Sequence, residues 1–346
     1  MTPPDTIAAL ATARGESALA IVRLSGPLAR EIAQSRFTNT ALADAPSHTA
    51  HVGWVTDARG QRVDQVVATV FRGPTSATGE DVVEISTHGG SAAPQAVLRA
   101  MLDAGARLAE PGEFTQRAFL AGKLDLAQAE AVADLIHARS TAAARAAARG
   151  VEGRTSDALA TIKDRLVETA ALVELELDFS DEDVEFADRS TLARLLAEAS
   201  GEIEALLSTA RLGAFVRDGV RVVIGGRPNA GKSTLLNALV EHDRAIVSDI
   251  PGTTRDSVEA EREIDGLLFR FVDTAGLRET EDAIEAEGVR RSKAAASGAD
   301  VLVYVHDARA GLDAPEAAFL RDLSDRRPDL PILRVANKAD LLSAET

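Results

Sequence analysis

A glycine-rich segment carries residues that could hold a polyphosphate. It reads Gly226-Arg-Pro-Asn-Ala-Gly-Lys-Ser and fits the pattern G-x-x-x-x-G-K-[ST]. It follows the apolar run Val220–Gly225 and precedes a helical pattern, the context that such a loop requires. Glycines let backbone N–H groups surround phosphate oxygens, Lys232 reaches the β and γ oxygens, and the Ser233 hydroxyl can ligate Mg²⁺. The alternative is a glycine-rich turn without a ligand.

Two further segments could hold the magnesium ion and the γ-phosphate. In Gly252-Thr-Thr-Arg-Asp, Thr254 is placed to ligate Mg²⁺ and to contact the γ-phosphate. In Asp273-Thr-Ala-Gly, Asp273 can hold the ion through water, and the Gly276 N–H can meet the γ-phosphate. The next residue is Leu277, where Ras-type GTPases have a glutamine that orients the attacking water. Because leucine cannot polarise water, we expect hydrolysis that is slow or assisted by another group.

A fourth segment could recognise the base. Asn337-Lys338-Ala339-Asp340 follows the strand-like run Ile332–Ala336. The Asp340 carboxylate can accept hydrogen bonds from guanine N1–H and from the exocyclic amine, a donor pair that adenine does not offer. The four segments occur in the order of a GTP site, each at the end of an expected strand, and therefore predict GTP binding.

Composition excludes several functions. The 346 residues include 38 Lys and Arg, 54 Asp and Glu and no cysteine, for a net charge of −16. The chain therefore has no disulfide framework, thiol nucleophile or cysteine-ligated metal. The charge argues against nucleic-acid binding by bulk electrostatics, although a local basic patch stays open. No run reaches the roughly 18 uncharged apolar residues of a membrane span, and no signal peptide is recognisable, so we expect a soluble cytoplasmic protein.

The elements that must position these residues follow three patterns along the chain. Up to about residue 120, short Val- and Ile-rich runs mix with helical segments, which indicates an α+β fold. The strands are expected at Ala18–Leu24, Val63–Phe71 and Val82–Thr87, and the helices at Ala92–Ala104 and Phe114–Ala121. Residues 124–212 contain no proline and space apolar residues helically, which predicts a helical hairpin or part of a bundle. The acidic stretch Asp178–Asp188 is interpreted as a solvated turn, with a cation site as the alternative.

From Arg217 onward, strands alternate with helices. This alternation is typical of a doubly wound α/β domain. The expected strands are Val220–Gly225, Glu259–Ile264, Leu268–Val272, Val301–His306 and Ile332–Ala336, and the expected helices are Lys232–Val240, Val289–Ser297 and Pro315–Ser324.

On its motifs, the chain resembles the MnmE (TrmE) family of tRNA-modification GTPases. Outside the nucleotide motifs, the resemblance rests on Asp5–Ile7, Ile21–Gly26, Gly79–Glu84, His88–Gly90 and above all Pro111–Ile136. It implies a tetrahydrofolate-binding, dimerising α+β domain at 1–120, the first part of a helical domain at 121–214 and a P-loop GTPase α/β domain at 215–346. Because the chain stops at Thr346, before a last strand, a guanine-supporting loop and further helices, we expect a fragment; a natural short form is the alternative.

The resemblance also implies a mechanism for the nucleotide site. The G domains of the family dimerise when K⁺ is bound, and K⁺ then supplies the positive charge of an arginine finger. The implied K⁺ ligands are Asn229, Ser248, Ile250 and Thr253, the Mg²⁺ ligands are Ser233, Thr254 and Asp273, and the catalytic residues are Glu285, Lys232 and Thr254. The implied GTP contacts are Asn229, Ala230, Gly231, Lys232, Ser233, Thr234, Ser248, Thr253, Thr254, Asp273, Gly276, Asn337, Lys338 and Asp340. Glu285 would act through water; the alternative is an exposed carboxylate at a helix start.

The resemblance implies a folate site and partners as well. Arg23, Glu84 and Lys123 match the positions that bind 5-formyltetrahydrofolate; the alternative for Arg23 and Lys123 is a surface ion pair. The family acts as a homodimer, and in a heterotetramer with the FAD-dependent MnmG. It adds an aminomethyl or carboxymethylaminomethyl group to C5 of the wobble uridine of tRNA, with carbon from methylene-tetrahydrofolate.

Two other functions stay open on the residues alone. An RNA- or ribosome-assembly GTPase switch without modification chemistry would need a basic RNA-binding module, and residues 1–212 are acidic instead. A folate-binding module with a degenerate G domain is the other. The intact nucleotide residues count against it, namely Lys232, Ser233, Thr254, Asp273 and Asp340.

Overall fold

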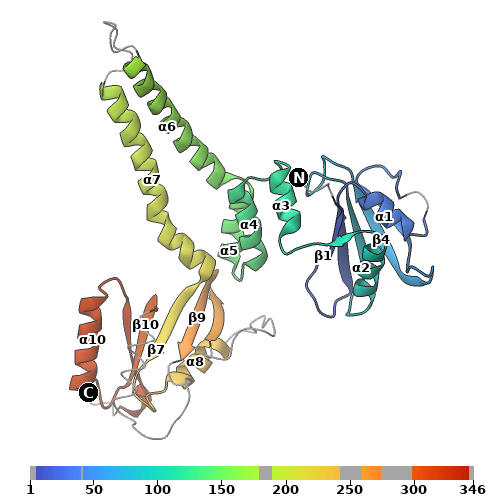
Figure 1. Ribbon diagram of the computed structural model, residues 1–346. Helices are drawn as coiled ribbons and strands as arrows, with labels where there is room; N and C mark the ends of the chain where they lie inside the picture. The colour runs from blue at the N-terminus through green and yellow to red at the C-terminus, as the bar shows by residue number, and fades with distance from the viewer. Residues whose placement is uncertain (1–4, 40–41, 179–188, 242–258, 274–297, 343–346) are drawn as a thin grey trace. The chain divides into compact units, whose positions relative to one another are not determined.

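The computed structural model describes residues 5–39, 42–178, 189–241, 259–273 and 298–342. Contacts divide the chain into two compact units (Figure 1). The first comprises residues 1–133 and 150–156, and the second comprises 134–149 and 157–346. The domain boundaries expected after residues 120 and 214 stay predictions. No helix among the described residues is both long and apolar enough to cross a membrane.

The first unit is built on a mixed sheet with the strand order β3-β4-β5-β2-β1-β6. Its strands are β1 (Ile7–Leu10), β2 (Leu19–Ser25), β3 (Thr49–Thr56), β4 (Arg62–Phe71), β5 (Val82–His88) and β6 (Arg107–Leu108). Helices α1 (Ala29–Ser35) and α2 (Ala93–Asp103) pack on one face (Figure 1). Alternation places Val22, Leu24, Val83 and Ile85 in that core, whereas Arg23 and Glu84 lie on the other, partly exposed face.

Some elements of this unit escape the sequence patterns. The strands at residues 18–24, 63–71 and 82–87 were predicted to within a residue, but β1, β3, β6 and α1 were not expected. β1 and β6 are too short to show alternation. Strand β3 contains Gly53, which weakens its pattern. A Cβ at Gly53 would lie 2.5 Å from the Phe37 ring, so the glycine makes room for a core side chain.

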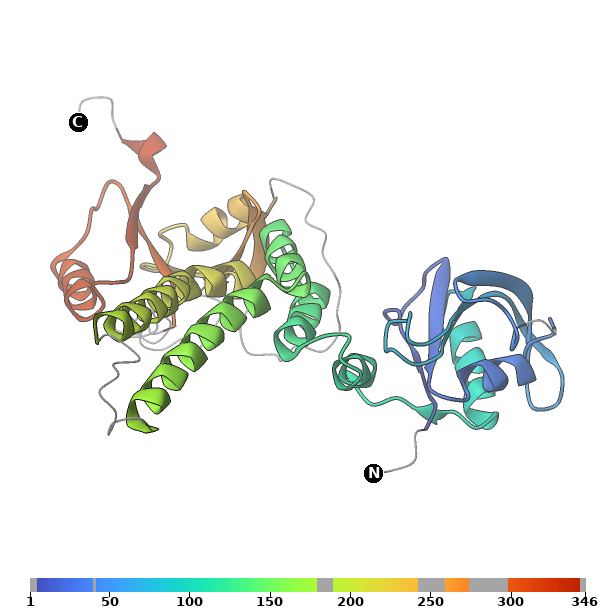
Figure 2. The same cartoon turned by 90° about the horizontal axis from the view of Figure 1, so that it is seen from above.

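Helices follow the sheet. They are α3 (Glu113–Leu120), α4 (Leu126–His137), α5 (Thr141–Val151), α6 (Arg154–Asp178) and α7 (Arg189–Asp218). In the second unit, α6 and α7 run side by side as the expected hairpin (Figures 1 and 2). Arg165 of α6 joins them through Glu202 at 3.0 Å and Glu198 at 3.5 Å.

The second unit also contains a sheet with the order β11-β10-β7-β9-β8, in which only β8 is antiparallel among the described strands. Its strands are β7 (Val220–Gly225), β8 (Glu259–Ile264), β9 (Leu267–Asp273), β10 (Val301–Asp307) and β11 (Ile332–Asn337), and its helices are α8 (Lys232–Glu241), α10 (Ala314–Arg326) and the 3-10 turn η1 (Ala339–Leu341). The core on the α10 side contains Val223 and Tyr304, and the core on the α8 side contains Val222 and Ile224. Helices therefore cover both faces, which confirms the doubly wound α/β fold. The helix expected at 289–297 lies outside the described residues.

Candidate functional site

The phosphate-binding loop joins the central strand β7 to the start of α8. Its backbone needs glycine at two positions, Gly226 with φ +137° and Gly231 with φ +96°. A Cβ at Gly226 would lie 2.1 Å from the Val305 carbonyl oxygen, and one at Gly231 would lie 2.0 Å from Asn337 Nδ2. Both positions therefore combine left-handed backbone with close packing. The loop is held in this shape by neighbouring strands rather than by its own sequence alone.

Lys232 lies inside this loop. Its side chain is buried, and Nζ donates to the carbonyl oxygens of Gly226 at 3.0 Å and Arg227 at 2.8 Å. A buried ammonium needs such acceptors, because its charge is otherwise costly to remove from water. Ser233 and Thr234 are exposed on the first turn of α8, where helix N–H groups and the helix dipole favour an anion. The arrangement can accept phosphate oxygens beside a fixed positive charge.

The segment at 337–340, which is predicted to recognise the base, is joined to the same loop. Asn337, the last residue of β11, donates from Nδ2 to the Ala230 carbonyl oxygen at 2.9 Å. Lys338 adopts φ +61°, and its Nζ lies 3.1 Å from Asp307 Oδ2. Asp340 is exposed in η1, so its carboxylate is accessible to a base. Parallel strands thus bring two segments about a hundred residues apart to one edge of the sheet.

The remaining predicted nucleotide residues are less fully described. Asp273 ends β9, and its Cα is paired with Ile224 of β7, which places the two strand ends together. Asn229 is exposed in the loop with φ +59°, and Ala230 is buried beneath it. Outside the described residues lie Ser248, Ile250, Thr253, Thr254, Gly276, Leu277 and Glu285, together with the acidic stretch at 179–188. Their roles stay predictions.

Sequence reasoning missed two residues beside this site. Arg227 occupies a variable position of the loop pattern, and its guanidinium pairs with Asp313. Asp307 ends β10 and accepts from Lys338 and from Arg309 at 2.8 Å. The Arg309 side chain, then its backbone N–H and Lys338, hold the pKa of Asp307 well below its usual range. The only sequence signal for Asp307 is its place at a strand end, and Arg227 has none.

Two of the three predicted folate residues, Arg23 and Glu84, lie on the partly exposed face of the first unit's sheet. Arg23 of β2 and Glu84 of β5 are directly paired in register. Arg23 Nε donates to Glu84 Oε1 at 2.8 Å, and both side chains are partly buried. The Arg23 guanidinium also lies 5.6 Å from the centre of the Phe114 ring of α3. Lys123 follows α3 and donates from Nζ to the Pro74 carbonyl oxygen at 3.1 Å. The structure thus brings Arg23 and Glu84 together, and places Lys123 on a loop beyond α3.

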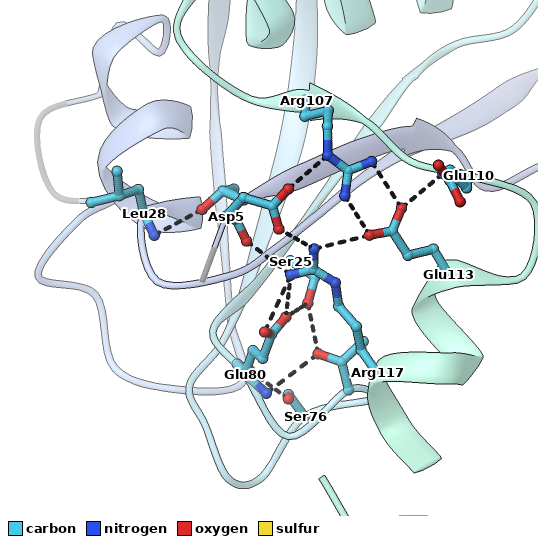
Figure 3. A network of polar contacts seen from close by, with 11 residues as sticks. Asp5, Ser25, Leu28, Ser76, Glu80, Arg107, Glu110, Glu113 and Arg117 are labelled. Atoms are coloured by element: carbon cyan, nitrogen blue, oxygen red, sulfur yellow. Dashed lines mark hydrogen bonds and ion pairs between the residues drawn. The ribbon is translucent and has the colours of Figure 1, made fainter. Parts of the chain in front are cut away.

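A network of charged groups attaches α3 to this sheet (Figure 3). Glu113, the first residue of α3, accepts from Arg107 Nη2 at 2.5 Å, from Arg117 Nη2 at 3.0 Å and from the Glu110 N–H at 2.8 Å. Both arginines also contact Asp5, Arg107 at 2.6 Å and Arg117 at 2.5 Å. The hydrogen bond from the Arg107 side chain is the main reason that the pKa of Glu113 is lowered to about 2, and the Glu110 N–H and Arg117 add to it. Burial acts in the opposite direction.

A second arm of the network reaches the loop before β5. Arg117 Nη1 lies 3.2 Å from both oxygens of Glu80, and Glu80 Oε2 accepts from Ser25 Oγ at 2.7 Å. Ser25, at the end of β2, is fully buried. Because α3 carries Phe114 and leads to Lys123, the network determines where these two residues stand relative to Arg23. The only sequence signal for Glu113 and Arg117 is their place in the segment 111–136.

The loop between β7 and α8 has the pattern of a phosphate-binding loop, and it contacts the segment after β11 that is predicted to recognise guanine. Together they define the class of the protein as P-loop GTP-binding proteins. Comparison with known proteins specifies the family. The chain is 62% identical over 340 residues to the tRNA modification GTPase MnmE of Salinibacter ruber, covering 98% of this chain and 74% of that protein. It is 49% identical over 337 residues to the protein of the same name from Cytophaga hutchinsonii, covering 97% and 72%. The chain belongs to the MnmE family of tRNA modification GTPases.

Family models agree with this assignment. The model described as the GTP-binding protein TrmE N-terminus matches residues 6–123, and the one described as the MnmE helical domain matches 126–342. The resemblance inferred from the motifs and the class of GTP hydrolase are thereby confirmed. A solved structure of a variant of Aquifex aeolicus Era, bound to GDP.AlF4-, is 31% identical over 35% of this chain and 41% of that chain. Its TM-score of 0.25 is too low to add to the assignment.

Proposed function

We propose that this chain hydrolyses GTP as part of the modification of the wobble uridine of tRNA. The observation that carries the proposal is that one loop contacts both predicted parts of a nucleotide site. Its Gly226 carbonyl oxygen accepts from Lys232, and its Ala230 carbonyl oxygen accepts from Asn337. A predicted phosphate site is thereby coupled to a predicted base site. Membership of the family supports the link to tRNA. GTP hydrolysis would drive a conformational cycle, while the bond-making belongs to the folate site and a partner.

The magnesium ion would be held by Ser233, Thr254 and Asp273. The described residues fit this role, since the exposed Ser233 lies on the first turn of α8, directly after the loop, and Asp273 ends the strand that neighbours β7. When bound there, the ion would supply positive charge against the negative charge that develops on the phosphate oxygens. Lys232 supplies a second positive charge, and Gly226 and Arg227 hold it inside the loop until phosphate replaces their carbonyl oxygens.

Potassium would be held by Asn229 together with Ser248, Ile250 and Thr253. Asn229 fits, because it is exposed on the loop with a side-chain amide oxygen that can ligate a cation. K⁺ supplies positive charge to the transition state when the G domains of two chains meet. Glu285 would orient the attacking water in place of the missing glutamine at position 277.

The N-terminal sheet face would hold tetrahydrofolate through Arg23, Glu84 and Lys123. The partly buried Glu84 carboxylate fits a pterin ring, because it has acceptor capacity beyond its bond with Arg23. Lys123 and Arg23 offer cations to a carboxylate tail. The 5-formyl and methylene forms would share this site, and the FAD-dependent MnmG would act with a homodimer of this chain. The cytoplasm, where tRNA is found, would be its location.

Two measurements test the proposal. The single-turnover rate of GTP hydrolysis should be higher in KCl than in NaCl, and Glu285→Ala should remove most of the KCl rate. An unchanged rate in Glu285→Ala removes that residue from the mechanism. Mass spectrometry of tRNA from a deletion strain should show wobble uridine without the added group, and normal modification would refute the assignment to this pathway.

A further inference from the structure

Arg227 connects the phosphate-binding loop to the start of α10. Its carbonyl oxygen accepts a hydrogen bond from Lys232 Nζ at 2.8 Å. Its guanidinium turns the other way, where Nη2 pairs with Asp313 Oδ2 and Nε lies 3.6 Å from Glu316 Oε1. The same residue therefore touches the catalytic lysine through its backbone and a separate helix through its side chain.

The acidic partners of Arg227 are held rigidly. Glu316 is 2% exposed; its Oε1 accepts from the Tyr304 hydroxyl at 2.9 Å and its Oε2 from the Asp313 N–H at 3.0 Å. Asp313 in turn accepts from the Glu316 N–H at 2.8 Å, which completes a capping box at the start of α10. Tyr304 is buried in β10, opposite Gly225 of β7. Burial is the main cause that raises the pKa of Tyr304 well above its usual range, and the hydrogen bond to the Glu316 carboxylate adds to it.

We infer that Arg227 is a positioning residue for phosphate binding. Its pairs with Asp313 and Glu316 hold the first turn of the loop against α10. They thereby fix the Gly226 and Arg227 carbonyl oxygens between which the ammonium of Lys232 rests. A lysine side chain is flexible, so its place depends on these acceptors. Without these ion pairs, a smaller fraction of the protein has the loop in the conformation that binds phosphate. The apparent affinity for the nucleotide falls in proportion to that fraction.

A second effect acts in the same direction. Asp313 and Glu316 are two carboxylates beside a loop that must receive a polyphosphate, and Arg227 neutralises part of their charge. Removing the guanidinium would leave both carboxylates facing the loop, which disfavours an anionic ligand. Lysine at this position would keep the positive charge but lose the planar guanidinium that can donate two parallel hydrogen bonds. Arg227→Lys should therefore retain more nucleotide affinity than Arg227→Ala.

The inference rests on the proposed nucleotide site and is tested on the full chain. The dissociation constant of a fluorescent GDP analogue with Mg²⁺ is measured for wild type, Arg227→Ala and Arg227→Lys, at a temperature well below the Tm of each nucleotide-free protein. We expect the dissociation constant to rise about tenfold for Arg227→Ala and about threefold for Arg227→Lys, which correspond to about 1.4 and about 0.7 kcal/mol. The control is Arg326→Ala, which removes an exposed ion pair with Asp322 on the same helix and should change affinity less than about twofold.

An affinity of Arg227→Ala within twofold of wild type, with a lower Tm, would mean that the pairs only stabilise the fold, and it overturns the inference. If Arg227→Ala fails to fold, Asp313→Asn decides, because asparagine keeps the helix cap and loses the ion pair. It should raise the dissociation constant several-fold, and an unchanged constant again overturns the inference. Absence of GDP binding by the wild type would instead refute the nucleotide site itself.

Discussion

Replacing Glu113 with glutamine tests the charged network that holds α3 to the sheet. The change keeps the size of the side chain and removes its charge between Arg107 and Arg117. The Glu113 side chain is 10% exposed, so solvent screens its interactions only weakly. Lowering a carboxyl pKa from 4.5 to about 2 corresponds to about 3 kcal/mol of stability, which sets the upper limit of the expected loss at pH 7.

The sign of the pH dependence follows from the lowered pKa. The stabilisation by Glu113 is fully present above the unfolded-state pKa of 4.5 and is lost as pH falls through the folded-state pKa of about 2. At pH 3, about 1.4 kcal/mol of the difference between wild type and Glu113→Gln should remain. Contributions from other carboxylates that titrate alike in both proteins cancel from this difference.

Urea unfolding followed by Trp54 fluorescence measures the effect. Trp54 is the only tryptophan of the sequence and lies in β3, within the unit that the network stabilises. With a slope of about 1–3 kcal/mol per molar urea, a loss at this upper limit would lower the urea midpoint at pH 7 by about 1–3 M, and a smaller loss would lower it in proportion. Glu110→Gln is the matched control, because Glu110 is exposed and its side chain has no ion pair among the described residues. A Glu113→Gln midpoint equal to that control, or a larger difference at pH 3 than at pH 7, would refute the reasoning.

Three further changes test the two sites. Gly226→Ala should lower the Tm and abolish GDP binding, since its Cβ would lie 2.1 Å from the Val305 oxygen; calorimetry that shows normal binding would contradict this. Asn337→Ala should weaken GDP binding about tenfold by removing the bond to Ala230, as measured by nucleotide fluorescence, and an unaltered affinity would show that the bond is dispensable. Glu84→Gln should weaken 5-formyltetrahydrofolate binding about tenfold or more in titration calorimetry without changing GDP affinity, and equal folate affinity would remove Glu84 from the site.

The nucleotide site could be predicted largely from local patterns. Residues 226–231 form a loop between a strand and a helix, and a loop of this pattern binds phosphate through its own backbone, so the order of residues along the chain carries the information. Strands β7 and β8 have the predicted bounds for the same reason, because apolar runs between turn residues leave few alternatives. Glycine at 226 and 231 is part of that pattern, although the packing that requires it lies in β10 and β11.

The amino-acid sequence by itself determined the family, the alternation of strands and helices from residue 217 onward and the residues that we predict to contact a nucleotide. Only the tertiary structure decided which charged groups meet across the fold: Arg227 with Asp313, Lys338 with Asp307 and Glu113 with Arg107. Charged side chains have no periodicity that names a partner, and most lie at surfaces where many partners are compatible with one pattern. Their pairing depends on strand order and helix placement, which arise from burying apolar faces elsewhere in the chain.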